Sequence, residues 1–464
     1  MQISKREFLR KLGLGGVGFA AGAAFGDEYK PDMSKLPEGS CGDPMNTWFG
    51  KHIFPLEHTM TDGPSCVLKD GKVYEPAKEI PVFHETDVVV VGGGPAGFAA
   101  AVAASRTGAK VALVERYGSL GGLFTNGMVL IMLSSSRNEN GRWTLVTRGV
   151  CEEFMRRAER LGGDFCTPLA NRNRNQPTVD PEAAKVLMDE MVAEAKVDMF
   201  FHSWGVDVIQ DGDRVLGVVF ESKEGRQAIL AKQVVDCSGD ADMLFKAGGD
   251  YSQVTAPIST VFRWANMDTI VPPKGARAPY QTHGNEGNPD ANWGGGRMMK
   301  GNGLSVRDLS RIEIVQRREN WEKVLKMRAT PGWEKIYTSN SASQLGVRQS
   351  RLVDAEFIIG RKEIHEGLSF SDTVGWFGDD GPHKAFPVCY RQILPKKVDN
   401  ILCAGRCLGT GDTIDTFRLI CPCFVTGEAA GTAAALAAKA GIAPRDLDVK
   451  LLQRTLESHN VYLG

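Results

Sequence analysis

Residues 87–97 read Asp-Val-Val-Val-Val-Gly-Gly-Gly-Pro-Ala-Gly, and this stretch decides the fold. Four successive β-branched residues without polar alternation predict a strand that is buried on both faces, as in a parallel sheet. The glycines that follow, Gly92, Gly94 and Gly97, fit the spacing G-x-G-x-x-G. Gly92 suits a tight turn, Gly94 the close approach of a diphosphate, and Gly97 the close packing of a helix on the strand.

The sequence after this stretch continues the same pattern. Residues 98–107 are rich in alanine and predict a helix that ends at Gly108, and residues 110–114 predict a second strand. Glu115 follows 23 residues after Gly92, close to the spacing of about 20 at which an acid binds the ribose of adenosine. An acid at this position disfavours a 2′-phosphate. The stretch therefore predicts a dinucleotide site that includes Pro95, Ala96 and Glu115.

Composition excludes several classes of protein. Of the 464 residues, 42% are hydrophobic and 24% are charged, which is typical of a globular chain and excludes a disordered, collagen-like or polytopic membrane protein. There are 55 basic and 56 acidic residues, so the formal net charge is −1. Because no global basic field exists to hold a phosphate backbone, we expect no nucleic acid among the partners.

The cysteine pattern gives no sign of a metal site. The chain has ten cysteines, and no pair of them forms C-x-x-C. Rubredoxin-like metal sites, thioredoxin-type redox motifs and haem attachment are therefore not supported, and we expect no bound metal. A group of four near the C-terminus, Cys403, Cys407, Cys421 and Cys423, is interpreted as small buried apolar residues.

The N-terminus reads as an export signal. Residues 1–26 open with four basic residues and continue with an uncharged run from Leu12 to Phe25. This run of 14 residues is too short to cross a bilayer about 30 Å thick, so we expect no stable membrane span. Residues 4–9 resemble the twin-arginine export motif, with Lys5 in place of the first arginine. We therefore expect a periplasmic or otherwise exported protein; the alternative is an amphipathic first helix.

Two further segments favour a flavin dinucleotide over a nicotinamide one. A second glycine-rich stretch, 116–127, directly follows the ribose acid and suits the close backbone contacts of a long cofactor; it contains Arg116, Gly121 and Gly122. Near the C-terminus, residues 423–431 are expected to open an alanine-rich helix over 432–439. The partial positive charge at the start of such a helix favours the negative charge of a reduced flavin. A helix that serves only for packing is the alternative.

The chain resembles the FAD-dependent oxidoreductase family of the glutathione-reductase-like two-dinucleotide-fold flavoproteins, which is related to the flavoprotein subunit of fumarate reductase. The stretches that carry the resemblance are 88–116, 121–129, 180–182, 234–242, 346–351, 404–409 and 427–436. The resemblance implies FAD as cofactor, held between the first glycine loop and the C-terminal helix. The cofactor-binding residues that it adds are Gly239, Asp240, Gly405, Arg406, Gly427 and Ala430.

The predicted fold class is α/β, with a Rossmann-like FAD-binding domain, built on a parallel sheet with a β-meander, and an inserted α+β substrate domain. A turn signal at 210–213 places the meander within 205–236, and Pro181 after Asp180 predicts a capped helix start. The first two expected parts are an export signal (1–26) and an N-terminal arm (27–83). The FAD-binding domain is expected in two parts (84–250 and 386–445), with a substrate or cap domain between them (251–385). A C-terminal tail (446–464) follows.

Four residues are candidates for catalysis. Asp412 and Asp415 lie between the Gly405 loop and the C-terminal helix, and the resemblance implies that this segment lies near the flavin ring. Arg348 and Arg351 match a family motif and are able to bind a carboxylate in forked geometry; salt bridges on a helix surface are the alternative. The histidines are candidates by residue type alone: His202, His283 and His383.

Three functions remain open. The first is an exported dehydrogenase or reductase that transfers a hydride between a small organic substrate and flavin N5. Its electrons would go to or come from a separate periplasmic redox partner, because the sequence holds no second nucleotide fingerprint and no haem or iron–sulfur motif. The second is a fumarate-reductase-like reductase of an unsaturated acid. The third is a flavin-bearing electron-relay subunit without a substrate of its own.

Overall fold

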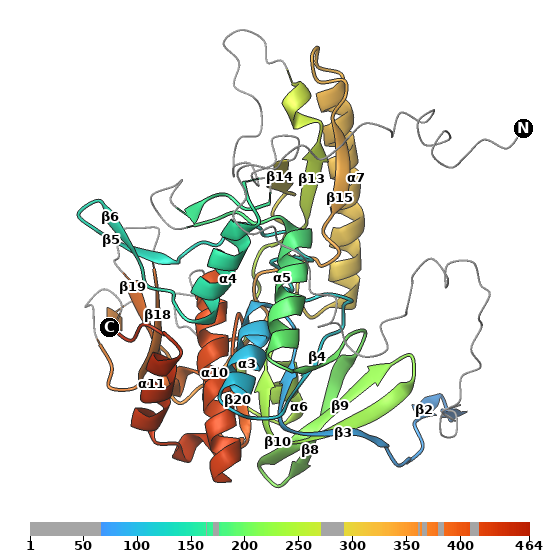
Figure 1. Ribbon diagram of the computed structural model, residues 1–464. Helices are drawn as coiled ribbons and strands as arrows, with labels where there is room; N and C mark the ends of the chain where they lie inside the picture. The colour runs from blue at the N-terminus through green and yellow to red at the C-terminus, as the bar shows by residue number, and fades with distance from the viewer. Residues whose placement is uncertain are drawn as a thin grey trace, which may run out of the picture. The chain divides into compact units, whose positions relative to one another are not determined.

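The computed structural model describes residues 66–163, 165–169, 176–270, 292–360, 362–363, 369–378, 385–408 and 417–464 (Figure 1). The predicted export signal and most of the predicted arm lie outside these residues. The described end of the arm forms an exposed hairpin, β1 (Val67–Lys69) and β2 (Lys72–Tyr74).

A seven-stranded sheet is the centre of the fold. Six of its strands follow the order β7-β4-β3-β10-β9-β8, and the seventh, β20, pairs with the last residues of β10. Strands β3, β4, β7, β10 and β20 pair in parallel, while β8, β9 and the first half of β10 form an antiparallel meander. The bounds are β3 Val82–Val91, β4 Val111–Val114, β7 Asp198–Phe200, β8 Trp204–Asp211, β9 Arg214–Ser222, β10 Gly225–Asp236 and β20 Ile401–Cys403. This arrangement confirms the predicted α/β class and the parallel sheet with a meander.

Strand β10 joins the two kinds of pairing because it is 12 residues long. Its first half, from Gly225 to Leu230, pairs with β9, and its last residues, Val234 to Asp236, pair with β20. Along most of its length its other edge pairs with β3. The carboxyl ends of β3, β10 and β20 therefore lie side by side, which is where ligands bind in such sheets.

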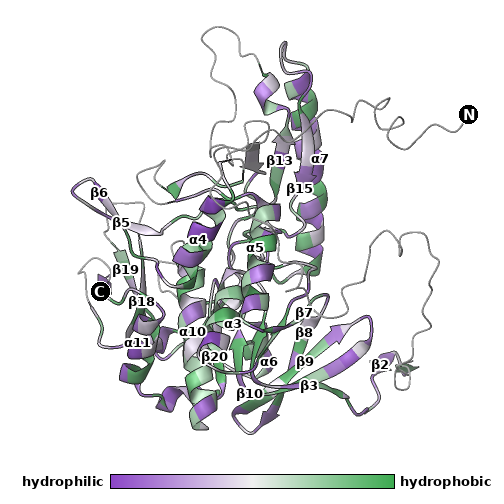
Figure 2. Cartoon of the chain, in the orientation of Figure 1, coloured by the Kyte–Doolittle hydropathy of each residue, from purple (hydrophilic) through white to green (hydrophobic). Residues whose placement is uncertain are grey.

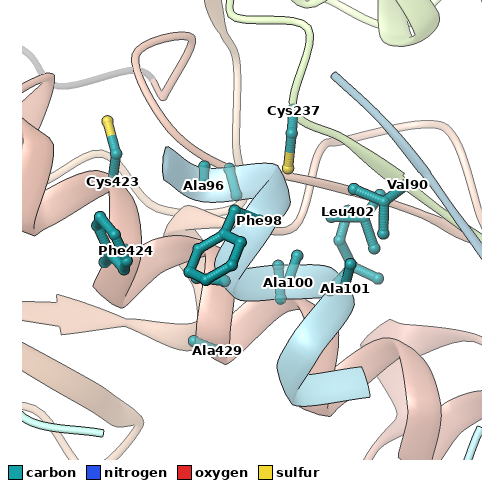
Figure 3. Close-up of a cluster of buried hydrophobic side chains, with 14 of the residues drawn as sticks. Val90, Ala96, Phe98, Ala100, Ala101, Cys237, Leu402, Cys423, Phe424 and Ala429 are labelled. Carbon is teal, nitrogen blue, oxygen red and sulfur yellow. The ribbon is translucent and has the colours of Figure 1, made fainter. Parts of the chain in front are cut away.

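Two helices made of small residues pack against each other beside this sheet: α3 (Pro95–Arg106) and α10 (Ile420–Ala440). Figure 3 shows Ala100 and Ala101 of α3 between the ring of Phe98 and the strand residues Val90 and Leu402, with Phe424 and Ala429 of α10 on the other side of Phe98. Glycine allows the close approach, because a side chain at Gly427 or Gly431 would overlap the backbone of α3. The C-terminal helix α10 begins at Ile420, three residues before the segment 423–431 that was expected to open it.

The helices α4 (Val150–Arg160) and α5 (Pro181–Glu194) complete the main core. Asp180 caps α5, with its carboxylate accepting hydrogen bonds from the amides of Glu182 and Ala183, and Pro181 occupies the first turn, as predicted. In Figure 2 the hydrophobic colour gathers on α3, α10 and the central strands, while α4 is largely hydrophilic. The short α6 (Asp242–Lys246) follows β10.

Residues 251–385 add small sheets and one long helix, α7 (Val306–Arg328). Strands β13, β14 and β15 form a sheet of three, and Phe262, Trp264 and Val324 belong to a small core between this sheet and α7. The described strands from Tyr251 to Cys389 and the 3-10 helix η3 are β11 Tyr251–Gln253, β12 Ile258–Ser259, β13 Val261–Ala265, η3 Met267–Thr269, β14 Asn292–Gly295, β15 Tyr337–Ser341, β16 Gly346–Val347, β17 Arg351–Val353, β18 Thr373–Gly378 and β19 Ala385–Cys389.

The remaining elements are short. The hairpin β5 (Ser136–Glu139) and β6 (Arg142–Leu145) precedes α4. The segment predicted as a C-terminal tail contains α11 (Val449–Ser458), whose Leu452 and Leu456 are buried in the main core. Two 3-10 helices complete the set: η4 Tyr390–Gln392 and η5 Pro444–Asp446.

One described helix, α10, has the length and apolar composition of a membrane span. Of its most apolar window, 94% is buried inside the fold. A core helix of small residues passes the same test of length and composition, so this helix is explained by packing against α3.

Candidate cofactor and active site

The turn between β3 and α3 leaves one glycine open and packs two others against backbone. Gly92 has φ +98°, and a Cβ there would overlap the carbonyl of Cys237; a Cβ at Gly97 would overlap the carbonyl oxygen of Gly92. Gly94 caps α3 with φ −66° and ψ −176°, and the nearest atom to a Cβ there is the Cα of Gly122 at 4.0 Å. The space that a diphosphate needs is therefore present beside Gly94, at the N-terminus of a helix.

Glu115 is fixed against this turn. Its Oε2 accepts a hydrogen bond from the Gly93 amide at 2.6 Å, and its Oε1 accepts one from the Tyr117 amide at 2.8 Å. The side chain is buried, and burial raises the pKa of Glu115 although the backbone hydrogen bonds oppose this shift. A carboxylate has about four acceptor positions, so Glu115 keeps acceptor capacity for a ribose.

Aromatic and basic side chains extend the site beyond Glu115. The Arg116 guanidinium lies 5.0 Å from the centre of the Tyr117 ring and 5.7 Å from that of Trp204. The Ser203 amide donates to the Glu115 carbonyl at 3.0 Å. Trp204 is 56% exposed, so this part of the site offers an aromatic surface.

The second glycine loop lies on the first. The Gly121 amide donates to the Gly93 carbonyl at 2.8 Å, and a Cβ at Gly122 would lie 2.9 Å from the Cα of Gly94. Both residues have positive φ, +100° and +49°. Gly122 faces the same space as Gly94, while Gly121 packs against Thr125.

The turn after β10 is organised by Asp236, which is fully buried. Its carboxylate accepts hydrogen bonds from the amides of Ser238, Met243 and Leu244 at 2.9–3.0 Å. This holds Gly239 under the Arg406 side chain, where a Cβ would lie 2.7 Å from Nε. Arg406 in turn forms an ion pair with Asp240 at 2.7 Å.

Gly405 and the first turn of α10 close the site on another side. Gly405 has φ +89°, and a Cβ there would lie 3.0 Å from the Cβ of Ala96 and 3.9 Å from the Sγ of Cys423. The expectation that Gly427 and Ala430 contact the cofactor is not met in this structure. Neither residue lines the cleft: both are buried, and Gly427 packs against the backbone of α3.

These elements surround one cleft of about 850 Å³, part of which is open to solvent. Its walls come from the ends of the parallel strands, both glycine loops, the turn after β10 and the start of α10. They are lined by Val91, Gly92, Gly94, Pro95, Ala96, Val114, Glu115, Arg116, Tyr117, Gly122, Leu123, Phe124, Ser203, Trp204, Gly205, Cys237, Ser238, Gly239, Asp242, Gln344, Gly405, Arg406, Arg418, Ile420 and Cys423. Most of the residues expected to bind the cofactor therefore meet in one place.

The candidates for catalysis are placed differently. Asp412 and Asp415 lie outside the described residues, and so do His283 and His383. Arg351 donates to Asp242 at 2.7 Å and to the Asp240 carbonyl at 2.9 Å. Its guanidinium lies 4.2 Å from the centre of the Phe245 ring.

These contacts make Arg351 part of the framework. Its side chain is 12% exposed and does not line the cleft, so the structure does not offer it as a carboxylate clamp. Arg348 donates to the Pro257 carbonyl at 3.1 Å and does not line the cleft either. Both expectations are corrected for the same reason, since the guanidinium groups hold neighbouring turns together.

Asp242 lines the cleft, and its carboxyl group has a raised pKa. Burial, with Asp240 and Asp236 nearby, raises the pKa of Asp242 to about 6, although the pairing with Arg351 opposes this shift. His202 has positive φ and lies beside Gly118 rather than in the cleft wall.

Several cleft residues were missed from the sequence. They are Ser203, Trp204, Gly205, Ser238, Gln344 and Cys423. A signal was available for Ser238, which lies within the motif 234–242. Gln344 carried no signal, because it comes from the region 251–385 and reaches the cleft only through the fold.

Comparison with known proteins now gives the class. The family model described as FAD dependent oxidoreductase matches residues 87–268 and 252–456. The chain therefore belongs to the FAD-dependent oxidoreductase family. It is an oxidoreductase, and its cofactor is FAD.

Curated relatives match only a short part of the chain. The dihydrolipoyl dehydrogenase of Trypanosoma brucei brucei is 54% identical over 46 residues, which is 10% of each chain. The sarcosine oxidase subunit alpha of Corynebacterium sp. (strain U-96) is 42% identical over 69 residues, which is 14% of this chain and 7% of that protein. The matches thus span about a tenth of the lengths of these relatives.

Solved structures match more of the chain at low identity. A geranylgeranyl bacteriochlorophyll reductase-like protein from Thermoplasma acidophilum is 13% identical, covers 82% of this chain and 84% of its own, and has a TM-score of 0.42. A flavocytochrome c3 fumarate reductase in an open conformation is 14% identical, covers 77% and 79%, and has a TM-score of 0.37.

The residues present fit FAD. Gly94 leaves space at the start of α3, Glu115 faces the same cleft, and the buried Nη1 of Arg406 and Oε1 of Gln344 have no hydrogen-bond partner in the described structure. Orphaned buried polar atoms are costly unless a ligand or water satisfies them. When bound, FAD supplies the redox chemistry, and the chain supplies binding and orientation.

Proposed function

We propose that the protein is an exported dehydrogenase or reductase that transfers a hydride between a small organic substrate and N5 of FAD. Electrons would then pass to or from a separate partner in the periplasm. The observation that carries the proposal is the mixed wall of the cleft, to which Gln344 from the region 251–385 contributes alongside the FAD-binding elements. A substrate domain that borders the cofactor cleft is what a reaction with a small molecule requires.

The chain's own residues suit such a reaction in three ways. The apolar side chains of Leu123, Phe124 and Ile420 line part of the cleft. The buried Oε1 of Gln344 is able to accept a hydrogen bond from a bound molecule. Arg418 adds a positive charge that favours an anionic group.

The reaction is tested by photometry of the purified holoprotein under anaerobic conditions. Reduced small molecules are added one at a time, and the absorbance of oxidised flavin is followed. We expect rapid bleaching by at least one substrate class, and reoxidation by an added electron acceptor. Gly94→Val, which is expected to lack FAD, serves as the control for direct reduction of the acceptor.

Two other outcomes decide for the alternatives. Reoxidation of the reduced protein by unsaturated acids would favour the fumarate-reductase-like function, for which the positions of Arg348 and Arg351 give no support. A flavin that ignores every small molecule and exchanges electrons only with a protein partner would contradict a substrate site and favour the relay function.

Export is tested separately, by fractionation of cells that express the full chain. We expect the protein in the exported fraction, and we expect deletion of residues 1–26 to retain it inside the cell. Replacement of Lys5 and Arg6 by glutamine distinguishes a basic export signal from an amphipathic helix. Equal distribution of all three proteins would contradict the proposal.

A further inference from the structure

Arg406 is the buried side chain in the cleft whose charge is only partly matched by the protein. Its side chain is 11% exposed, and Nη2 donates to Asp240 Oδ2 at 2.7 Å. Nη1 is buried and has no partner in the described structure. A guanidinium is able to donate in two parallel directions, so one side of this group is bound by Asp240 and the other is left without a protein partner in the described structure.

The arginine is held in place from two directions. Asp240 accepts a hydrogen bond from the Ser350 hydroxyl, and its carbonyl accepts one from Arg351 at 2.9 Å. The neighbouring Gly405 amide donates to Thr426 of α10 at 3.1 Å. Arg406 is therefore positioned before any ligand binds, which lowers the entropy cost of binding.

The position of the loop puts this group beside the start of α3. The Cβ of Ala96, in the first turn of α3, would lie 3.0 Å from a Cβ at Gly405, the residue before Arg406. The helix begins with Pro95, which has no amide hydrogen, so this N-terminus offers one donor fewer than an ordinary helix. The helix dipole supplies only about half a positive charge, whereas a diphosphate carries about two negative charges.

From these observations we infer that Arg406 binds the diphosphate of FAD, donating from Nη1 to a phosphate oxygen while Asp240 holds Nη2. Arg116, which also lines the cleft, lies instead over the rings of Tyr117 and Trp204. The diphosphate is thus bound both by backbone amides at the start of α3 and by the guanidinium group of Arg406. The inference rests on FAD binding and is independent of the proposed substrate and of export.

The test measures binding to the apoprotein by calorimetry, with three probes: FAD, ADP and riboflavin. ADP carries the diphosphate without the isoalloxazine ring, and riboflavin carries the ring without a phosphate. Arg406→Met is expected to weaken FAD and ADP by the same factor, about 10- to 100-fold, since a charge-assisted hydrogen bond to phosphate is lost. Riboflavin binding is expected to stay unchanged.

Arg226→Met is the matched control. Arg226 also pairs with an aspartate, Asp207 at 3.2 Å, and also has a buried nitrogen without a partner, but it does not line the cleft. This variant is expected to bind all three probes like the wild type. Arg406→Lys keeps the charge and loses the fork, so it should show a smaller loss, again equal for FAD and ADP. It also carries the test if Arg406→Met fails to fold.

Three results would overturn the inference. One is unchanged ADP binding by Arg406→Met with weakened FAD binding, which would place the arginine at the flavin or the ribityl chain. Another is unchanged binding of both ligands. The third is Arg406→Lys binding ADP as weakly as Arg406→Met, which would show that the positive charge has no part in recognition. Circular dichroism of each apoprotein separates these results from misfolding.

Discussion

The helices α3 and α10 are built from the same small residues, but their glycines serve different purposes. Gly94 at the start of α3 faces an open cleft, while Gly427 within α10 presses against the backbone of α3. Both positions belong to motifs that resemble FAD-binding segments. The comparison shows that a glycine motif marks close approach, and that only the fold decides whether the approaching group is a ligand or another helix.

The largest effect is expected at the helix contact. Gly427→Val would place a side chain into the carbonyl of Ala96, and neither backbone has room to move because both helices are buried. We expect a loss of about 3 kcal/mol or more in the free energy of unfolding, since overpacking against backbone is costly. Denaturant unfolding of the apoprotein measures it.

Ala440→Val, at the exposed end of the same helix, is the control and should change stability by less than about 1 kcal/mol. If Gly427→Val folded as stably as this control, the close contact between α3 and α10 would be wrong.

The next effect concerns the open glycine. Gly94→Val adds a side chain where the protein leaves space and where φ and ψ suit any residue. We expect the apoprotein to unfold at an unchanged temperature while FAD content falls below about a tenth of the wild-type value, because the side chain fills the diphosphate space. Absorbance of the purified protein reports the flavin content.

Gly163→Val is the matched control for this prediction, because Gly163 also has open space around it and lies away from the cleft. It should retain both FAD and stability. Full flavin content in Gly94→Val would mean that the diphosphate does not lie at the start of α3.

The smallest effect concerns two buried acids, Glu115 and Glu428, of which the second follows directly after Gly427. Glu115 has both oxygens hydrogen-bonded to amides, while Glu428 accepts only from the Val150 amide at 2.9 Å and leaves Oε1 without a partner. Burial raises the pKa of Glu428 to about 8. The fold therefore favours the protonated acid, and its stability contribution is present below the unfolded pKa near 4.5 and is lost as pH rises through about 8.

Glu428→Gln has no such titration. We expect the unfolding free energy of this variant to increase relative to that of the wild type by roughly 2 kcal/mol between about pH 5 and about pH 6.5. Glu182→Gln, at an exposed position, should show no comparable change. A constant difference between Glu428→Gln and the wild type over this range would contradict the raised pKa.

Local patterns of the sequence predicted much of the fold. The strand at 87–91, the helix after it, the capped start of α5 at Asp180 and the turn of the meander at Gly212 all follow from residues close in sequence. Hydrophobic runs, helix caps and turn residues act over a few positions, so they can be recognised from the sequence alone.

Other features could not be read in this way. The early start of α10 was missed because Pro422 and two cysteines precede its alanine run, although a proline fits the first turn of a helix. The motif around Arg351 suggested a carboxylate clamp, while the fold places Asp242 and Phe245 around that guanidinium. These partners are more than a hundred residues away in sequence.

By itself, then, the sequence determined the dinucleotide-binding unit and the α/β class, because that unit is continuous and its spacing is set by one strand, one turn and one helix. FAD as the expected cofactor came from segments outside this unit and from the resemblance to the family. Only the tertiary structure decided which glycines face the cleft, which arginines are free to meet a ligand and which distant residues, such as Gln344, complete the wall. The physical reason is that packing brings together side chains that are far apart in the sequence. Local sequence patterns do not show which of these side chains become neighbours.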